Sequence, residues 1–220
     1  KYNVIHLDIS SVWDFHKEDL ADTIKKRICK DFKKEYGDTL DYNEDLYLLI
    51  QEIYEITEIQ FVIIIDEWDC VIRNSDDKEL VHEYLQFLHS LFKSEESKSF
   101  LALAYITGIL PIKKLKTQSA LNNFKQYTML NPGPLAEYIG FTEEEVKKLC
   151  DRYERDFHKV KKWYDGYQLG KYHIYNPNAV VSLMMEGEFR SYWSETDSYR
   201  IIVPLINMDF DGLKSAIIEM

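Results

Sequence analysis

Two adjacent carboxylates, Asp66 and Glu67, follow an apolar run in the segment at 61–69, which reads FVIIIDEWD. An Asp at the end of a strand can hold a hydrated Mg²⁺ ion, which prefers oxygen ligands and keeps most of its waters. A Glu beside it can polarise an attacking water. These residue types, in this order, suit a nucleotide site. The simpler alternative is a buried strand that ends in a polar turn.

The apolar run before the two acids predicts the element that carries them. Five apolar residues in succession, three of them isoleucine, are typical of a strand buried on both faces at the centre of a parallel sheet. In α/β sheets, ligands bind beyond the carboxyl ends of the strands. We therefore expect Asp66 and Glu67 to lie at the ligand-binding edge of such a sheet.

Strand and helix patterns alternate around this central run. Loose alternation at 2–9 predicts a strand, and the apolar run at 99–108 predicts another that ends near Thr107. Apolar residues that recur every four positions predict a helix over about 17–36. The other elements expected here are a helix capped by Asn43, a helix over about 78–92 opened by Asp76 or Asp77, and a short strand at 127–130. This order predicts an α/β fold, a parallel sheet with crossover helices.

A cluster of turn residues at 131–134, Asn-Pro-Gly-Pro, predicts a domain boundary. We expect an α/β domain over 1–131 and a smaller, mainly helical, lid-like domain over 132–220. Thr142 and Glu145 have the spacing of a capping box, which predicts a helix from Glu143 to about Tyr153. The other elements expected are a helix over 157–164, a small hairpin with its turn at Asp165-Gly166, and a helix from Pro177 to about Met185.

Composition limits the classes of partner. The formal net charge of −11 argues against an anionic membrane or a large nucleic-acid footprint, although a local basic groove is compatible with it. The cysteines Cys29, Cys70 and Cys150 are odd in number and far apart, which fits a reducing compartment better than a disulfide framework. The sequence has no signal peptide and no apolar run of about 18 residues. We therefore expect a soluble cytoplasmic protein.

Seven segments, taken together and in order, resemble a known family: FVIIIDEWD, YITGILPIKK, SALNN, GFTEEEV, WYDGYQLG, IYNPNAVVSL and YWSET. The family is the AAA-ATPase-like domain of bacterial proteins, a STAND-type group of P-loop NTPases that a PD-(D/E)XK nuclease-like region often follows. The resemblance runs from Tyr2 to about Thr196. It implies a P-loop NTPase fold and a switch driven by nucleotide hydrolysis, with protein partners or a nuclease-like region downstream. It also implies ATP and Mg²⁺ as cofactors of the complete protein, with weak or no binding by this chain alone.

The resemblance also implies roles for individual residues. Asp66 and Glu67 resemble the Walker B pair, so Asp66 would hold Mg²⁺ and Glu67 would activate water. Thr107 resembles a sensor residue that feels the terminal phosphate. Asp69 falls in a DEYD-like string, where Trp68 replaces the usual Tyr, and it joins Asp66 as a cofactor-binding candidate. The segment at 119–123 matches a serine- and asparagine-containing loop of the family.

One motif of the family is missing from this sequence. No GxxxxGK[ST] occurs in it, and Gly37 is its first glycine. The backbone of that loop cradles phosphates, and its Lys and Ser/Thr hold phosphate and Mg²⁺. In the family's topology the first strand lies beside the strand that ends at Thr107. We therefore expect that the chain, which starts with Lys, is a portion of a longer protein or has closed its sheet over the gap.

Two functions from different classes remain open. The first is an ATP-binding and hydrolysing switch domain that uses Asp66, Glu67 and Thr107. The second is a relative that no longer hydrolyses ATP and acts as an interaction module. The missing loop favours the second for this chain alone, which we expect to be inactive as an ATPase, whereas the intact Asp66-Glu67 pair favours the first for the complete protein. A metal-dependent nuclease built on Asp66 and Glu67 would need a lysine shortly after the acids, and none stands there.

Other candidate residues have simple alternatives. The lysine-rich loop at 113–125 is either a solvated loop or a contact for phosphate or nucleic acid. Asp165 is either a turn residue or a catalytic one. The aromatic residues of the second domain are either its core or, for one of them, a base-stacking surface: Tyr164, Tyr167, Tyr175, Tyr192 and Trp193.

Overall fold

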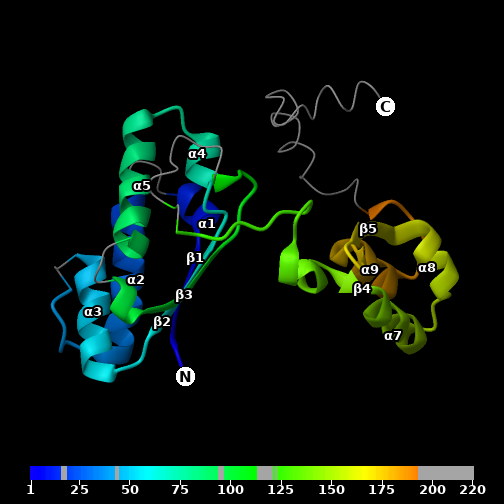
Figure 1. The fold of residues 1–220 in the computed structure, drawn as a ribbon, viewed down its shortest axis with the longest axis horizontal. Coiled ribbons are helices and arrows are strands. Elements are labelled where there is room, and N and C mark those ends of the chain that lie inside the picture. Colours follow the sequence, from blue (N-terminus) through cyan, green and yellow to red (C-terminus); the bar gives the residue numbers. More distant parts are fainter. Residues whose placement is uncertain (16–18, 43–44, 94–96, 113–120, 122, 193–220) are drawn as a thin grey trace. The chain divides into compact units, whose positions relative to one another are not determined.

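The computed structural model describes residues 1–220 except 16–18, 43–44, 94–96, 113–120, 122 and 193–220 (Figure 1). Its contacts divide the chain into two compact units, Lys1–Gln126 and Tyr127–Met220. The division falls a few residues before the Asn-Pro-Gly-Pro cluster. Among the helices of the described residues, none combines the length and the apolar character that crossing a membrane requires.

The first unit is built on a parallel sheet. Its strands are β1 (Asn3–Asp8), β2 (Phe61–Asp66) and β3 (Leu101–Ile106), in the order β1-β2-β3. This arrangement confirms the predicted α/β class and the central place of β2. The third strand is shorter than predicted because residues 97–100 form a turn of helix, α6 (Ser97–Phe100), before it.

Helices connect these strands, and the longer ones lie along one side of the sheet (Figure 1). Their apolar stripes meet the inner face of β2 in one core, which includes Ile24 of α2, Ile50 of α3 and Leu88 of α5. Asp77 caps α5 as predicted, whereas the predicted cap Asn43 lies outside the described residues. The helices are α1 (Ile9–Trp13), α2 (Leu20–Tyr36), α3 (Leu46–Thr57), α4 (Cys70–Asn74) and α5 (Lys78–Lys93).

The two faces of the sheet differ in burial. Ile63 and Ile65 of β2 are fully buried under the helices, but Val62 and Ile64 on the other face are only half-buried. Beside them on that face, Val4 is 61% exposed and Leu103 is 56% exposed. The expectation that β2 is buried on both faces is therefore wrong for the described residues, because the helices pack on one face only. Within the same residues β3 pairs with β2 alone.

The prediction of a strand at 127–130 is wrong. The N–H and C=O groups of Thr128 and Asn131 bond each other, at 3.1 and 3.0 Å, and close a local turn. The backbone of this segment therefore satisfies its hydrogen bonds within itself rather than with a neighbouring strand.

The second unit packs helices around a small antiparallel sheet of order β4-β6-β5. Thr142 and Glu145 form the predicted capping box, and α7 has the predicted bounds. A buried core made of Val146, Val160 and Leu183 joins the three α-helices. The elements are η2 (Gly133–Tyr138), β4 (Phe141–Thr142), α7 (Glu143–Tyr153), α8 (Phe157–Tyr164), β5 (Asp165–Leu169), β6 (Tyr172–Tyr175) and α9 (Pro177–Glu186).

The hairpin in this unit turns at a different place from the one predicted. Asp165 and Gly166 begin β5, where the register shifts, and the chain reverses at Gly170 and Lys171. Gly170 has a φ of +60°, a conformation that glycine adopts without steric cost and that a two-residue hairpin turn requires. The pairing of β5 with β6 places the turn at Gly170-Lys171, and the Asp165-Gly166 pair lies at the irregular start of β5.

Candidate functional site

Three polar residues lie at the carboxyl ends of the three neighbouring strands. Asp8 ends β1, Asp66 ends β2, and the two are register partners. Thr107 follows β3, and its N–H donates to the C=O of Ile65 at 2.9 Å, which extends the ladder by one step. The parallel sheet therefore gathers two carboxylates and a hydroxyl along the edge where α/β folds bind ligands.

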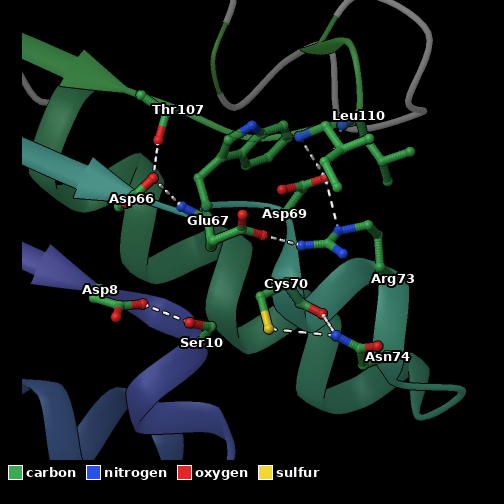
Figure 2. Close-up of polar contacts among 12 residues, drawn as sticks. Asp8, Ser10, Asp66, Glu67, Asp69, Cys70, Arg73, Asn74, Thr107 and Leu110 are labelled. Atoms are coloured by element: carbon green, nitrogen blue, oxygen red, sulfur yellow. Dashed lines mark hydrogen bonds and ion pairs between the residues drawn. The ribbon is translucent and has the colours of Figure 1, made fainter. Parts of the chain in front are cut away.

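Asp66 and Thr107 are in direct contact, as Figure 2 shows. The Thr107 hydroxyl donates to Asp66 Oδ1, and the N–H of Glu67 donates to the same oxygen at 3.0 Å. Among the described residues no hydrogen bond reaches the other oxygen, Oδ2. The structure thus brings together two of the predicted site residues that are 41 positions apart in sequence.

Glu67 has an unusual backbone conformation. Its φ is +53°, which is uncommon for a residue with a side chain and is concentrated at functional sites and tight turns. This conformation turns the chain sharply out of β2 and into α4. The side chain keeps 36% of its surface exposed, and its carboxylate accepts a hydrogen bond from Arg73.

Asp69 is buried completely, unlike the two acids before it. Its Oδ2 accepts hydrogen bonds from the N–H groups of Ile109 and Leu110, at 3.1 and 2.7 Å. Arg73 supplies the compensating charge, with Nε 3.0 Å from the same oxygen. The carboxylate therefore fastens the segment after β3 to the turn after β2. Direct contact of Asp69 with a cofactor stays a prediction.

The turn after β2 packs tightly against the segment after β3. The N–H of Trp68 donates to the C=O of Thr107 at 3.0 Å, and the Tyr84 hydroxyl donates to the C=O of Trp68 at 2.8 Å. At Gly108 an added Cβ would lie 2.4 Å from Asp69 Oδ1 and 2.6 Å from the Trp68 ring. A glycine is therefore required where these two segments cross.

Sequence reasoning missed Asp8 and Arg73 as parts of the site. Asp8 ends the first strand, and hydrogen bonds from the Ser10 hydroxyl and the Ser11 N–H lower the pKa of its carboxyl. The signal that was available is the position of Asp8 at a parallel strand end. Arg73 could have been found from its spacing four residues after Asp69, which puts both on one side of a helix turn.

The oxygen donors at the sheet edge suit Mg²⁺, but they form only part of a site. Within the described part of the chain, no group of three or more His, Cys, Asp or Glu side chains could hold a metal ion. Asp66 and Asp8 fit the common case in which one or two carboxylates hold Mg²⁺ and waters and substrate phosphates complete its shell. The loop at 113–120, with its lysines and the start of the serine- and asparagine-containing segment, lies outside the described residues.

Comparisons with known proteins bear on the family of the chain. A family model described as "Predicted AAA-ATPase" matches residues 1–117. A protein of Azotobacter chroococcum mcd 1, described as "Uncharacterized protein in vnfD 5'region", is 26% identical over 164 residues. Those residues make up 72% of this chain and 31% of that protein, so the chain spans about a third of the length of this curated relative. No solved structure matches. Since the family model covers more than half of the chain, the protein belongs to the AAA-ATPase-like family.

Proposed function

We propose that the chain carries the magnesium and water side of an ATP-binding and hydrolysing switch domain of the STAND type. The observation that carries this proposal is the contact of Asp66 with Thr107 at the carboxyl edge of a parallel sheet, with Glu67 next in sequence. A metal-binding acid, a water-activating acid and a phosphate-sensing hydroxyl would have to meet at this edge.

Each residue has a stated role in the proposal. Asp66 would hold a water of Mg²⁺ through Oδ2, because its Oδ1 already accepts two hydrogen bonds. Glu67, whose side chain is partly exposed, would take a proton from the attacking water. Thr107 would exchange its bond to Asp66 for one to the terminal phosphate. When bound, Mg²⁺ would supply charge neutralisation on the phosphates.

The sequence also favours a second candidate, an interaction module that does not hydrolyse ATP. No GxxxxGK[ST] motif occurs in the 220 residues, so the phosphate cradle would have to come from other residues. In this case the sheet edge would keep its polar residues but would bind Mg-ATP weakly or not at all.

Calorimetric titration with Mg-ATP, together with turnover measurements, separates the two candidates. If the site is an ATPase site, Glu67→Gln keeps the affinity for Mg-ATP and lowers turnover about 10²–10⁴-fold, because only the general base is lost. Asp66→Asn weakens binding in Mg²⁺ but not in EDTA. The titration is repeated with whatever coding sequence precedes Lys1 restored. Equal turnover in wild type and Glu67→Gln would contradict the assigned roles.

A further inference from the structure

Arg73 joins the two acidic side chains that follow β2. It lies on α4, and 13% of its side chain is exposed. Its Nη2 donates to Glu67 Oε2, and its Nε lies 3.0 Å from Asp69 Oδ2 (Figure 2). The second contact is not aligned as a hydrogen bond, so it is an ion pair by distance alone. One guanidinium thus contacts the exposed acid and the buried acid at the same time.

The buried acid extends this connection to the next strand. Asp69 has no exposed surface, and its Oδ2 accepts the N–H groups of Ile109 and Leu110. These residues follow Thr107, whose hydroxyl is bonded to Asp66. A continuous set of polar contacts therefore runs from Glu67 through Arg73 and Asp69 to the segment that carries Thr107.

Resting on the proposed function, we infer that Arg73 is the positioning residue of Glu67. Its planar guanidinium presents N–H groups in a fixed fork, so a side chain that is anchored on one carboxylate sets the place of the other. Asp69 is the anchor, because it is buried and bonded to backbone. Glu67 is the group that is placed, because its side chain is 36% exposed and, among the described residues, its other oxygen, Oε1, accepts no hydrogen bond.

The alternative is that Arg73 has a purely structural role. In that case Arg73 only neutralises buried Asp69 and holds the five-residue helix α4, and its bond to Glu67 has no consequence. The two roles predict different coupling between Arg73 and Glu67, that is, a different effect of changing one residue when the other is already changed. Substitution by Lys keeps a positive charge near Asp69 but removes the fork, so Arg73→Lys is the variant of choice and its folding is checked by thermal melting.

The first measurement does not depend on activity. NMR spectra of the arginine side chains in the full chain report rotation of the Arg73 guanidinium, with the resonance assigned from Arg73→Lys. We expect rotation to speed up at least tenfold in Glu67→Ala, while the Ile109 and Leu110 amides keep their protection from hydrogen exchange. Asp69→Asn should speed up the rotation of Arg73 and also lower the protection of the Ile109 and Leu110 amides. Glu144→Gln, a charge loss in the other unit, is the control. Unchanged Arg73 rotation in Glu67→Ala would overturn the inference.

The second measurement uses turnover of Mg-ATP. We expect Arg73→Lys to lower kcat about tenfold with KM within twofold, because the base is misplaced while nucleotide binding is kept. The double variant Arg73→Lys/Glu67→Ala should be no slower than Glu67→Ala, since Arg73 acts through Glu67. Losses that multiply would overturn the inference. If the wild type shows no turnover even with the preceding coding sequence restored, the proposed ATPase function fails, and the NMR result alone decides whether Arg73 places Glu67.

Discussion

Gly108 lies where the turn after β2 and the segment after β3 leave no room for a side chain. An added methyl group would meet Asp69 Oδ1 at 2.4 Å and the Trp68 ring at 2.6–2.7 Å; both side chains are buried, and Asp69 is also held by hydrogen bonds to its Oδ2. Neither can withdraw without breaking the link between the turn after β2 and the segment after β3. The close approach of these segments therefore depends on the absence of a side chain at this position.

We predict that Gly108→Ala destabilises the fold by about 1–3 kcal/mol, the usual cost of overpacking a well-packed core. Urea denaturation followed by circular dichroism measures this change. The matched control is Gly166→Ala, where the nearest atoms lie at ordinary contact distances of 3.6 and 3.8 Å. If both variants have the same unfolding midpoint, the segments at Gly108 separate more easily than their packing indicates.

The residues of the site were predictable from sequence to different degrees. Asp66 and Thr107 end neighbouring strands, and parallel strands bring their carboxyl ends to one edge, so their proximity follows from the strand pattern. The roles of Asp69 and Arg73 did not follow. They depend on how a five-residue helix turns and on which acid becomes buried, and both are set by tertiary packing. Sequence reasoning therefore treated the exposed Asp66 and the buried Asp69 alike, as cofactor-binding candidates.

At the scale of elements, Glu143 connects two helices of the second unit. Its carboxylate pairs with Lys147 in α7 and with Lys161 in α8, each at 2.7 Å. Hydrogen bonds from these two ammonium groups lower the pKa of Glu143 to about 2 from its ordinary value of 4.5. Because the folded-state pKa is the lower one, the contribution of this carboxylate is complete above about pH 4.5 and disappears as the pH falls towards 2.

We predict that Glu143→Gln lowers stability at pH 7 by about 1 kcal/mol, the range of partly exposed ion pairs, and has a much smaller effect near pH 2. Unfolding midpoints in urea at several pH values measure the difference between the variant and the wild type. Glu144→Gln removes an equal charge from the same helix turn and serves as the control. A difference that stays constant from pH 7 to pH 2 would contradict the assignment of the pKa to this pair.

Elements with strong local signals were predicted well, and those that depend on neighbours were not. The capping box fixed the start of α7 because both of its bonds are local to residues 142–145. The hairpin turn was predicted at Asp165-Gly166 but lies at Gly170-Lys171. The sequence contains two glycine-containing pairs that could form the turn, and which one does so depends on the pairing of the strands. The prediction of a strand at 127–130 was wrong because a strand needs a partner, and the apolar residues of this segment do not show whether a partner strand is present.

At the scale of the whole molecule, the two units have separate cores. The buried cluster of the first unit runs from Ile5 to Leu121, and the main cluster of the second runs from Val146 to Tyr192. Each cluster contains side chains from the helices and the sheet of its own unit. Domains with independent cores can in principle fold alone.

We therefore predict that a fragment of residues 127–220 folds without the first unit. Backbone amide NMR shifts of α7, α8 and α9 in the fragment should match those of the full chain, because Val146, Val160 and Leu183 belong to one buried cluster within this unit. A fragment in which Val160 is changed to Asp is the control for an unfolded spectrum. If the amide shifts of the unmodified fragment lose their dispersion and resemble those of the Val160→Asp control, the second unit requires the first unit to fold.

Three glutamates, Glu58, Glu67 and Glu154, share the same positive φ of 53–54°. Glu58 and Glu154 end α3 and α7, where glycine is the residue that helix ends prefer. An engineer who seeks heat tolerance would choose glycine for all three, because each exchange relaxes the backbone. Two of these exchanges would leave the sheet edge unchanged, but the third would remove the carboxylate that the proposed function requires, because among the three only Glu67 lies at that edge.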